Sequence, residues 1–181
     1  MRQTFVAITV AAALVGLPRV GRVQASDDHD DQAGATSHRV RHFHARLQGA
    51  NEVPPVSTVG RGRLSLALDE GASTIAFELS YEGLEGGAVG AAHVHFGPPR
   101  VNGGVMFFFC GPAPNQPCPA SPGSVTGVIT PANIVGPGNQ GIAAGEFAEA
   151  VKALRAGLTY ANVHTATFGG GEIRGRVDPG R

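Results

Sequence analysis

Residues 92–97 read Ala-His-Val-His-Phe-Gly, and the rest of the chain can be understood by working outward from them. Histidine and apolar side chains alternate in this run, which glycines bound on both sides. Alternation is typical of a β-strand, in which successive side chains point to opposite faces. His93 and His95 therefore share one face of the strand, and Val94 and Phe96 take the other. Two imidazoles spaced in this way can converge on one point.

Short runs of the same kind recur on either side of this strand. They predict further strands at residues 42–47, 63–68, 75–81, 105–109, 124–130, 160–168 and 172–177. Apolar residues recur at helical spacing only over residues 146–156 and on to Leu158, and Gly157 is placed to end that helix. The chain also contains 27 glycines, which suit many tight turns. We therefore predict an all-β fold, an antiparallel, Greek-key-like β-sandwich of about 7–8 strands with one short helix.

The first 39 residues do not belong to this predicted fold. Residues 1–25 combine an early arginine, an apolar run and a final Val-Gln-Ala, which is the pattern of a cleaved signal peptide. Residues 26–39 contain four aspartates and few large apolar side chains, which predicts a disordered acidic linker. The folded domain is then expected at residues 40–178, in a protein that is secreted or periplasmic and has no transmembrane segment.

The charge balance argues against a nucleic-acid partner. The 14 basic and 14 acidic side chains cancel over the whole chain, but three arginines lie within residues 1–25. The exported protein would keep 11 basic side chains against 14 acidic ones. Nucleic-acid binding needs a concentrated excess of positive charge, and the same reasoning disfavours heparin-like partners and anionic membranes.

The two cysteines indicate a disulfide. Cys110 and Cys118 enclose a proline-rich segment without regular structure, and two cysteines so close together in an exported protein are expected to pair. Their spacing is a poor signature for metal binding.

Four motifs in order resemble the CHRD domain, the module named after chordin. They are Phe43-x-Ala45-x-Leu47-x-Gly49-x-Asn51-Glu52-Val53-Pro54-Pro55, Ala92-His93-Val94-His95, Asn162-Val163-His164-Thr165 and Gly171-Glu172-Ile173-Arg174-Gly175. The resemblance runs over about residues 40–177. It implies a β-rich extracellular module without an agreed enzymatic activity.

The histidines are also similar, more distantly, to the copper site of Cu,Zn superoxide dismutases. In that resemblance His93, His95 and His164 match three copper ligands, and Arg174 matches the arginine that guides the anion. The chain departs from the pattern because no zinc-binding loop of histidine and aspartate lies between His95 and His164. The disulfide also lies elsewhere in the sequence.

Two interpretations of the histidines follow. In the first, His93, His95 and His164 bind copper or zinc, with Asn162, Glu172 and Arg174 around them and an open position for water, Glu172 or a substrate. In the second, the same side chains form a structural hydrogen-bond network that fixes the packing. His42 and His44 share a face of the first strand, and we expect them to be exposed.

No other constellation indicates an enzyme. The chain lacks a Gly-x-Ser-x-Gly motif, and its only lysine, Lys152, lies on the predicted helix rather than in a phosphate-binding loop. Glu52 with Glu172 would make a poor glycosidase pair in a chain without tryptophan, and Glu52 is more simply a turn or strand-end residue. We therefore expect a binding or interaction module without established catalysis, and the alternative is a mononuclear copper or zinc protein that resembles the superoxide dismutases.

Overall fold

The computed structural model describes residues 40–180, so the predicted signal peptide and acidic linker lie outside the described residues. The strands are β1 (Arg41–Gln48), β2 (Arg61–Asp69), β3 (Thr74–Glu82), β4 (Val89–Phe96), β5 (Gly104–Cys110), β6 (Gly123–Ile129), β7 (Thr159–Thr165), β8 (Ile173–Arg176) and β9 (Asp178–Pro179). One α-helix, α1 (Phe147–Arg155), and three short 3₁₀ turns, η1 (Gly49–Asn51), η2 (Pro131–Asn133) and η3 (Gly138–Gln140), complete the described part. Within it, no helix is both long and apolar enough to cross a membrane.

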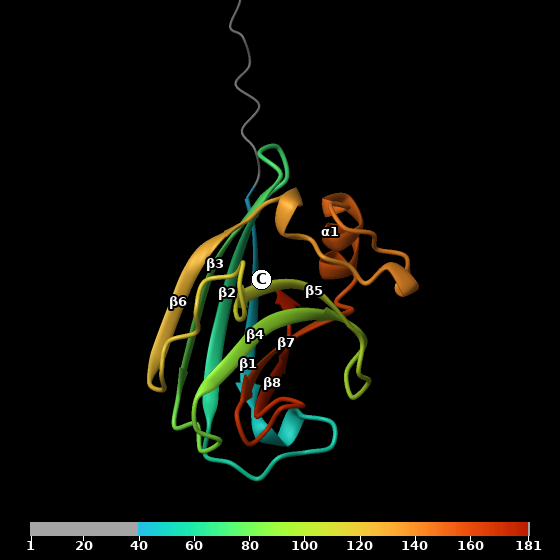
Figure 1. The fold of residues 1–181 in the computed structure, drawn as a ribbon. Coiled ribbons are helices and arrows are strands. Elements are labelled where there is room, and N and C mark those ends of the chain that lie inside the picture. The colour runs from blue at the N-terminus through green and yellow to red at the C-terminus, as the bar shows by residue number, and fades with distance from the viewer. Residues whose placement is uncertain (1–39, 181) are drawn as a thin grey trace, which may run out of the picture. The chain divides into compact units, whose positions relative to one another are not determined.

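All the strands pair antiparallel in one sheet with the order β5-β4-β7-β8-β1-β2-β3-β6, and β9 pairs with β1. The sheet curls until its two edge strands, β5 and β6, approach each other, so that it is nearly closed into a barrel (Figure 1). The predicted all-β antiparallel fold with a single helix is confirmed. The strand boundaries agree closely with the alternating runs, except that β4 begins at Val89 rather than at residue 92 and β7 ends at Thr165 rather than at residue 168. The chain turns there because Ala166 and Thr167 donate to the carbonyl oxygens of Ala88 and Gly86.

The inner face of the curled sheet forms the apolar core. On β1, β2 and β3 buried and exposed residues alternate, as the period of a strand requires when one face meets water. Helix α1 adds Phe147, Val151 and Leu154 to the core. Gly157 has a φ of +65° just after the helix, a conformation that favours glycine and that ends the helix there. Leu158, which the helical spacing had included, lies beyond this turn and is partly exposed.

Strands β4 and β7 differ from β1, β2 and β3 because both of their faces are buried. Their inner face carries apolar residues such as Val94 and Val163, as the alternation predicted. Their outer face carries polar side chains, and loops cover it. The segments that bond to these side chains come from residues 97–103 and 166–171, and the segment at residues 83–88 bonds to Glu172 just before β8. A polar surface that would otherwise face water is thereby enclosed.

Candidate metal centre

The three histidines meet because of the way the strands pair. β4 lies beside β7, and His93 is directly opposite Asn162 while His95 is opposite Tyr160. Residues that face each other across an antiparallel pair lie on the same side of the sheet, as do residues two positions apart along a strand. His164 therefore joins His93 and His95 on the outer face, although about 70 residues separate the two strands in the sequence.

One ring nitrogen from each of the three histidines lies within 4.8 Å of the others. His93 is the middle member, since its ring centre is 4.5 Å from that of His95 and 4.5 Å from that of His164. A common metal at about 2 Å from each nitrogen requires nitrogens about 3–4 Å apart. The most widely separated nitrogens would have to approach by roughly 1–2 Å to reach that spacing.

Backbone carbonyl groups orient two of these rings. Nδ1 of His95 lies 2.8 Å from the carbonyl oxygen of Gly103, and Nδ1 of His164 lies 3.0 Å from that of Gly169. A carbonyl oxygen can only accept a hydrogen bond, so each Nδ1 carries the hydrogen and donates it, and in the neutral ring Nε2 then carries the lone pair. This is the arrangement by which proteins commonly hold a metal-binding histidine in one tautomer.

Two nitrogens of the cluster are buried without a hydrogen-bond partner among the described residues, namely Nδ1 of His93 and Nε2 of His164. Nε2 of His95 lies 3.1 Å from Oδ1 of Asn162, an oxygen that has no proton to offer its lone pair. Buried polar atoms without partners are rare and point to a role beyond packing. Nε2 of His95 and Nε2 of His164 thus carry lone pairs, and the neutral ring of His93 has one more on Nδ1 or Nε2 according to its tautomer.

Burial keeps the three rings neutral. His93 is 6% exposed, and burial, followed by the nearby His164 and His95, lowers its pKa to about 2. Burial likewise lowers the pKa values of His95 and His164, against the opposing effect of their carbonyl partners. Since a metal binds only the neutral imidazole, these shifts favour binding.

Tyr160 and Arg174 form the wall beside His95. The Tyr160 ring stacks on His95 with centres 4.6 Å apart, and the Arg174 guanidinium carbon lies 3.3 Å from the centre of the same ring. Arg174 is 2% exposed, and its two Nη atoms donate to Asn102 and to the carbonyl oxygen of Val101. The arginine is thus committed to holding the loop at residues 97–103, unlike the anion-guiding arginine that the superoxide dismutase resemblance implies.

Glu172 lies away from the rings and serves another purpose. Its carboxylate accepts hydrogen bonds from the hydroxyl groups of Thr58 and Thr165 and from the backbone N–H groups of Glu85 and Gly86. Burial raises the pKa of this carboxyl group, but the four hydrogen bonds outweigh it and hold the pKa below its usual value. Glu172 therefore fastens two loops to β8, and its oxygens are already occupied.

The sequence interpretation missed the burial of Glu52. It follows η1, as a turn residue would, but is only 4% exposed, and its Oε1 has no hydrogen-bond partner among the described residues. Burial raises its pKa to about 7, although Arg174, the Val53 N–H group and Asn162 act in the opposite direction. The side chain lies under Gly171, where a Cβ atom would collide with its carboxyl group. A signal was present in the sequence, because Glu52 and Gly171 both belong to the CHRD-like motifs.

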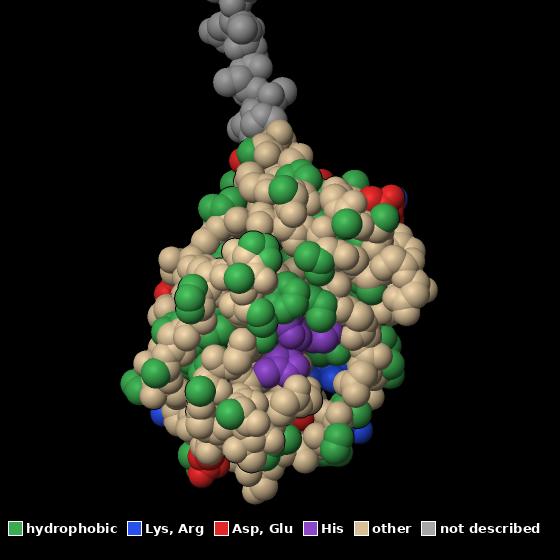
Figure 2. Space-filling model, viewed as in Figure 1, with side chains coloured by type: hydrophobic (Ala, Val, Ile, Leu, Met, Phe, Trp, Pro, Cys, Tyr) green, Lys and Arg blue, Asp and Glu red, His purple; other side chains and the backbone are tan. Residues whose placement is uncertain are grey.

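Glu52, Tyr160 and Arg174 line a cavity of about 540 Å³ beside the cluster. Figure 2 shows histidine side chains gathered at the surface of the domain among hydrophobic side chains, although His93 and His95 are only 6% and 8% exposed. The face that the loops enclose is therefore not sealed from solvent.

The remaining predicted side chains are also placed. Cys110 and Cys118 form a disulfide, as their spacing predicted, and it closes the proline-rich loop between β5 and β6. His42 and His44 lie on the exposed face of β1, and they take no part in the cluster.

The comparisons with known proteins agree with this fold. The family model described as the CHRD domain matches residues 43–177, which cover β1 to β8 and all three histidines of the cluster. No curated protein sequence and no solved structure matches the chain.

Proposed function

Because the chain belongs to the CHRD domain family, we propose that it is an exported binding module and that one of its ligands is a single copper or zinc ion, held by His93, His95 and His164. The observation that carries this proposal is the set of buried, unpartnered ring nitrogens. Nδ1 of His93 and Nε2 of His164 would otherwise lose their hydrogen bonds to water on folding and gain nothing in return.

The donor set suits these metals. Neutral imidazole nitrogen is a good ligand for both Cu(II) and Zn(II), and sites of this kind generally bind Cu(II) more tightly. A bound ion would supply a Lewis acid, and copper would add one-electron chemistry. The protein contributes the orientation of two rings through Gly103 and Gly169, and an apolar wall at Phe108, whose ring centre is 4.9 Å from that of His93.

The structural-network interpretation remains the competitor, and Asn162 distinguishes the two. If its side-chain amide turned by 180°, its NH₂ group would donate to Nε2 of His95, and that lone pair would be satisfied without a metal. If a metal binds, the amide must instead move away from this nitrogen. The first arrangement predicts that His95 stabilises the domain whether or not metal is present.

Thermal melts of the exported protein test the proposal. The melting temperature of the parent protein is measured in EDTA, with added Cu(II) and with added Zn(II). It should be higher with either metal than in EDTA. A free metal concentration one hundred times the dissociation constant stabilises the folded state by about 2.7 kcal/mol. For a domain of this size that corresponds to a rise of roughly 6–11 °C. Elemental analysis after dialysis should find about one ion per chain.

The His95→Ala variant should lose the metal-dependent rise and keep its fold. The matched control is the double variant His42→Ala/His44→Ala, which removes two exposed histidines of β1 that take no part in the cluster. This variant should keep the metal-dependent rise in melting temperature. Identical melts of the parent with and without metal would refute the metal site and leave the structural network in its place. A rise of equal size in the His95→Ala variant would place the ion elsewhere.

We also propose that residues 1–25 are a signal peptide. The Cys110–Cys118 disulfide supports this proposal, because disulfides persist in oxidising compartments. The intact mass of the secreted protein should begin at Ser26 and show no free thiol. A mass that includes residues 1–25 would contradict the export proposal and would leave the metal site untouched.

A further inference from the structure

One row of residues crosses the outer face of the sheet at right angles to the strands. Arg46 on β1 lies directly opposite Arg63 on β2, which lies opposite Ser80 on β3, which lies opposite Ser124 on β6. On the other side, Gln48 of β1 pairs with Arg174 of antiparallel β8, so Arg46 faces Arg176 two residues further along.

Three arginines therefore occupy adjacent strands, with backbones about 4.8 Å apart. We call the row Arg176, Arg46, Arg63, Ser80 and Ser124 the arginine row.

The arginine row is electrostatically unfavourable by itself. Like charges directly opposite each other on neighbouring strands repel and destabilise a sheet. Arg176 pairs with Asp178 at 3.0 Å, and neighbouring Arg61 pairs with Glu82 at 2.9 Å. Within residues 40–180, no carboxylate forms an ion pair with Arg46 or Arg63, and both side chains are exposed. The face thus presents positive charge that a ligand can neutralise.

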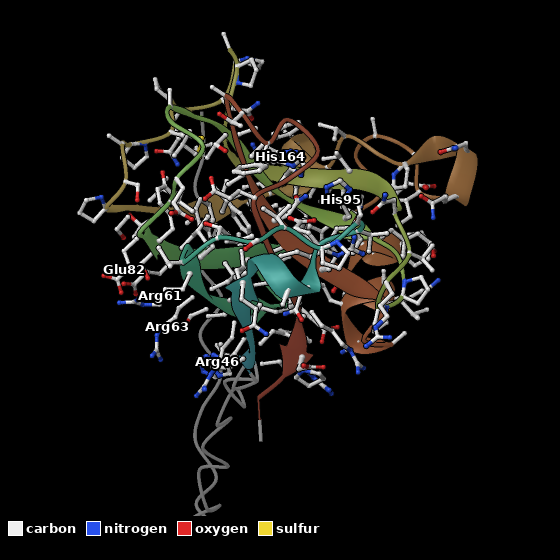
Figure 3. The ribbon with its side chains drawn as sticks, turned by 90° about the horizontal axis from the view of Figure 1, so that it is seen from below. Arg46, Arg61, Arg63, Glu82, His95 and His164 are labelled. Atoms are coloured by element: carbon white, nitrogen blue, oxygen red, sulfur yellow. A yellow bond between two sulfur atoms is a disulfide. The ribbon has the colours of Figure 1, made fainter. Side chains whose placement is uncertain are left out.

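The surface along the row is hollowed. A cavity of about 620 Å³ is lined by Arg46, Arg61, Arg63 and both serines of the row. A second, of about 370 Å³, is lined by Arg46 and Arg176. The two share Arg46, so the hollows follow the row from one strand to the next. Figure 3 shows Arg46, Arg61 and Arg63 on a different side of the domain from His95 and His164, so these arginines lie apart from the metal centre, whereas Arg176 also lines the cavity beside it.

We propose that the arginine row binds an acidic polysaccharide, a sugar polymer that carries a carboxylate or sulfate group along its length. The guanidinium group forms paired hydrogen bonds with such anions, and the two unpaired guanidinium groups, Arg46 and Arg63, lie on neighbouring strands where they can meet successive charges of a polymer, while Arg176 already pairs with Asp178. The row ends in two serine hydroxyl groups, which suit the hydroxyl groups of a sugar.

An acidic peptide fits this surface less well. Peptides commonly add a strand to a free sheet edge, but β8, β1 and β2 each have neighbours on both sides, so their backbone groups are already paired. The row also lacks the exposed aromatic or aliphatic anchors that dominate protein interfaces. The net negative charge expected for the exported protein does not oppose local binding, because salt screens charges more than about 8–10 Å away.

Binding to immobilised polymers tests this inference, with EDTA present so that the metal centre plays no part. The full exported chain is measured against polygalacturonate, dextran sulfate, neutral dextran and poly-L-glutamate. We expect binding to polygalacturonate or dextran sulfate, with the stronger of the two identifying the anion. Raising NaCl from 0.05 to 0.5 M should weaken this binding strongly.

The double variant Arg46→Ser/Arg63→Ser should bind about tenfold more weakly, because it loses two exposed ion pairs. Its melting temperature should be equal to or above that of the parent, because the repulsion is relieved. The matched control, Arg41→Ser/Arg155→Ser, removes two exposed arginines that lie outside the row near Glu70 and should bind as the parent does.

Equal weakening in both double variants would overturn the site. So would equal binding to neutral dextran, preferential binding to poly-L-glutamate, or no binding to either anionic polysaccharide.

Discussion

We expect the Glu52→Gln variant to become more stable than the parent as the pH rises. The carboxyl group of Glu52 is buried, and its pKa is about 7 in the folded protein against an ordinary value of 4.5. The folded state therefore holds a proton that the unfolded chain releases between these two values. Glu52 favours folding fully below pH 4.5, and this contribution is lost as the pH rises towards 7.

The size of the effect follows from the difference between the two pKa values. Each pKa unit corresponds to about 1.4 kcal/mol, so the loss amounts to about 3 kcal/mol at pH 8. Glutamine has nearly the shape of the protonated side chain and does not titrate. The unfolding free energy of Glu52→Gln should therefore match that of the parent near pH 4 and exceed it by about 3 kcal/mol at pH 8.

Urea unfolding of both proteins in EDTA at pH 4, 5.5, 7 and 8 measures this difference. The histidines titrate equally in the two proteins, so their effects cancel when the free energies are subtracted. A difference that stays constant across this range would refute the raised pKa, and with it the claim that burial outweighs the nearby Arg174.

Glu172→Gln is the matched control because its carboxylate is also buried but has a lowered pKa. Its contribution to stability is present above the ordinary pKa of 4.5 and is lost as the pH falls through the folded value. The variant should be less stable than the parent at pH 7, by at least about 2 kcal/mol, because an amide cannot accept all four hydrogen bonds. This loss should shrink in acid, which is the opposite trend to that of Glu52→Gln.

Three further outcomes are expected. The metal-free domain should lose stability as the pH falls below about 6.5, because histidines bind protons in the unfolded chain but stay neutral when buried in the folded domain. His93 alone accounts for about 2 kcal/mol of this loss between pH 6.5 and 5. An unfolding free energy in urea and EDTA that does not change with pH would contradict this. Replacing Cys110 and Cys118 with serine should lower the unfolding free energy by no more than about 3 kcal/mol, because the closed loop is short, and a larger loss would give the bridge a wider structural role. Gly171→Ala should cost about 2–3 kcal/mol because its φ is +121° and its Cβ meets Glu52, and the cost should fall in a Glu52→Ala background unless backbone strain alone causes it.

The sequence by itself determined which residues form strands and which side of each strand faces the core. Alternation has a period of two and depends only on neighbours along the chain, so His93 and His95 could be assigned to one face and Val94 to the other. The helix, the disulfide and the exposed face of β1 could also be predicted, because each depends on residues close together in the chain. The four CHRD-like motifs, taken in order, predicted that these strands belong to one β-rich domain.

Only the tertiary structure decided which strands are neighbours, because strand order is set by packing between segments far apart in the chain. The pairing of β4 with β7 brings His164 to the other two histidines, and the loops over them lower their pKa values. The same folding buries Glu52 under Gly171 and occupies Glu172 with four donors, which alternation along a strand cannot reveal.

Net charge is a further property that the sequence gives only as a sum. Counted along the chain, the charges that remain without residues 1–25 disfavour an anionic partner. In the folded sheet, the registers of β8, β1 and β2 place Arg176, Arg46 and Arg63 side by side. Salt screens Coulomb interactions beyond about 8–10 Å. A ligand therefore responds to this local arrangement of arginines rather than to the net charge of the chain.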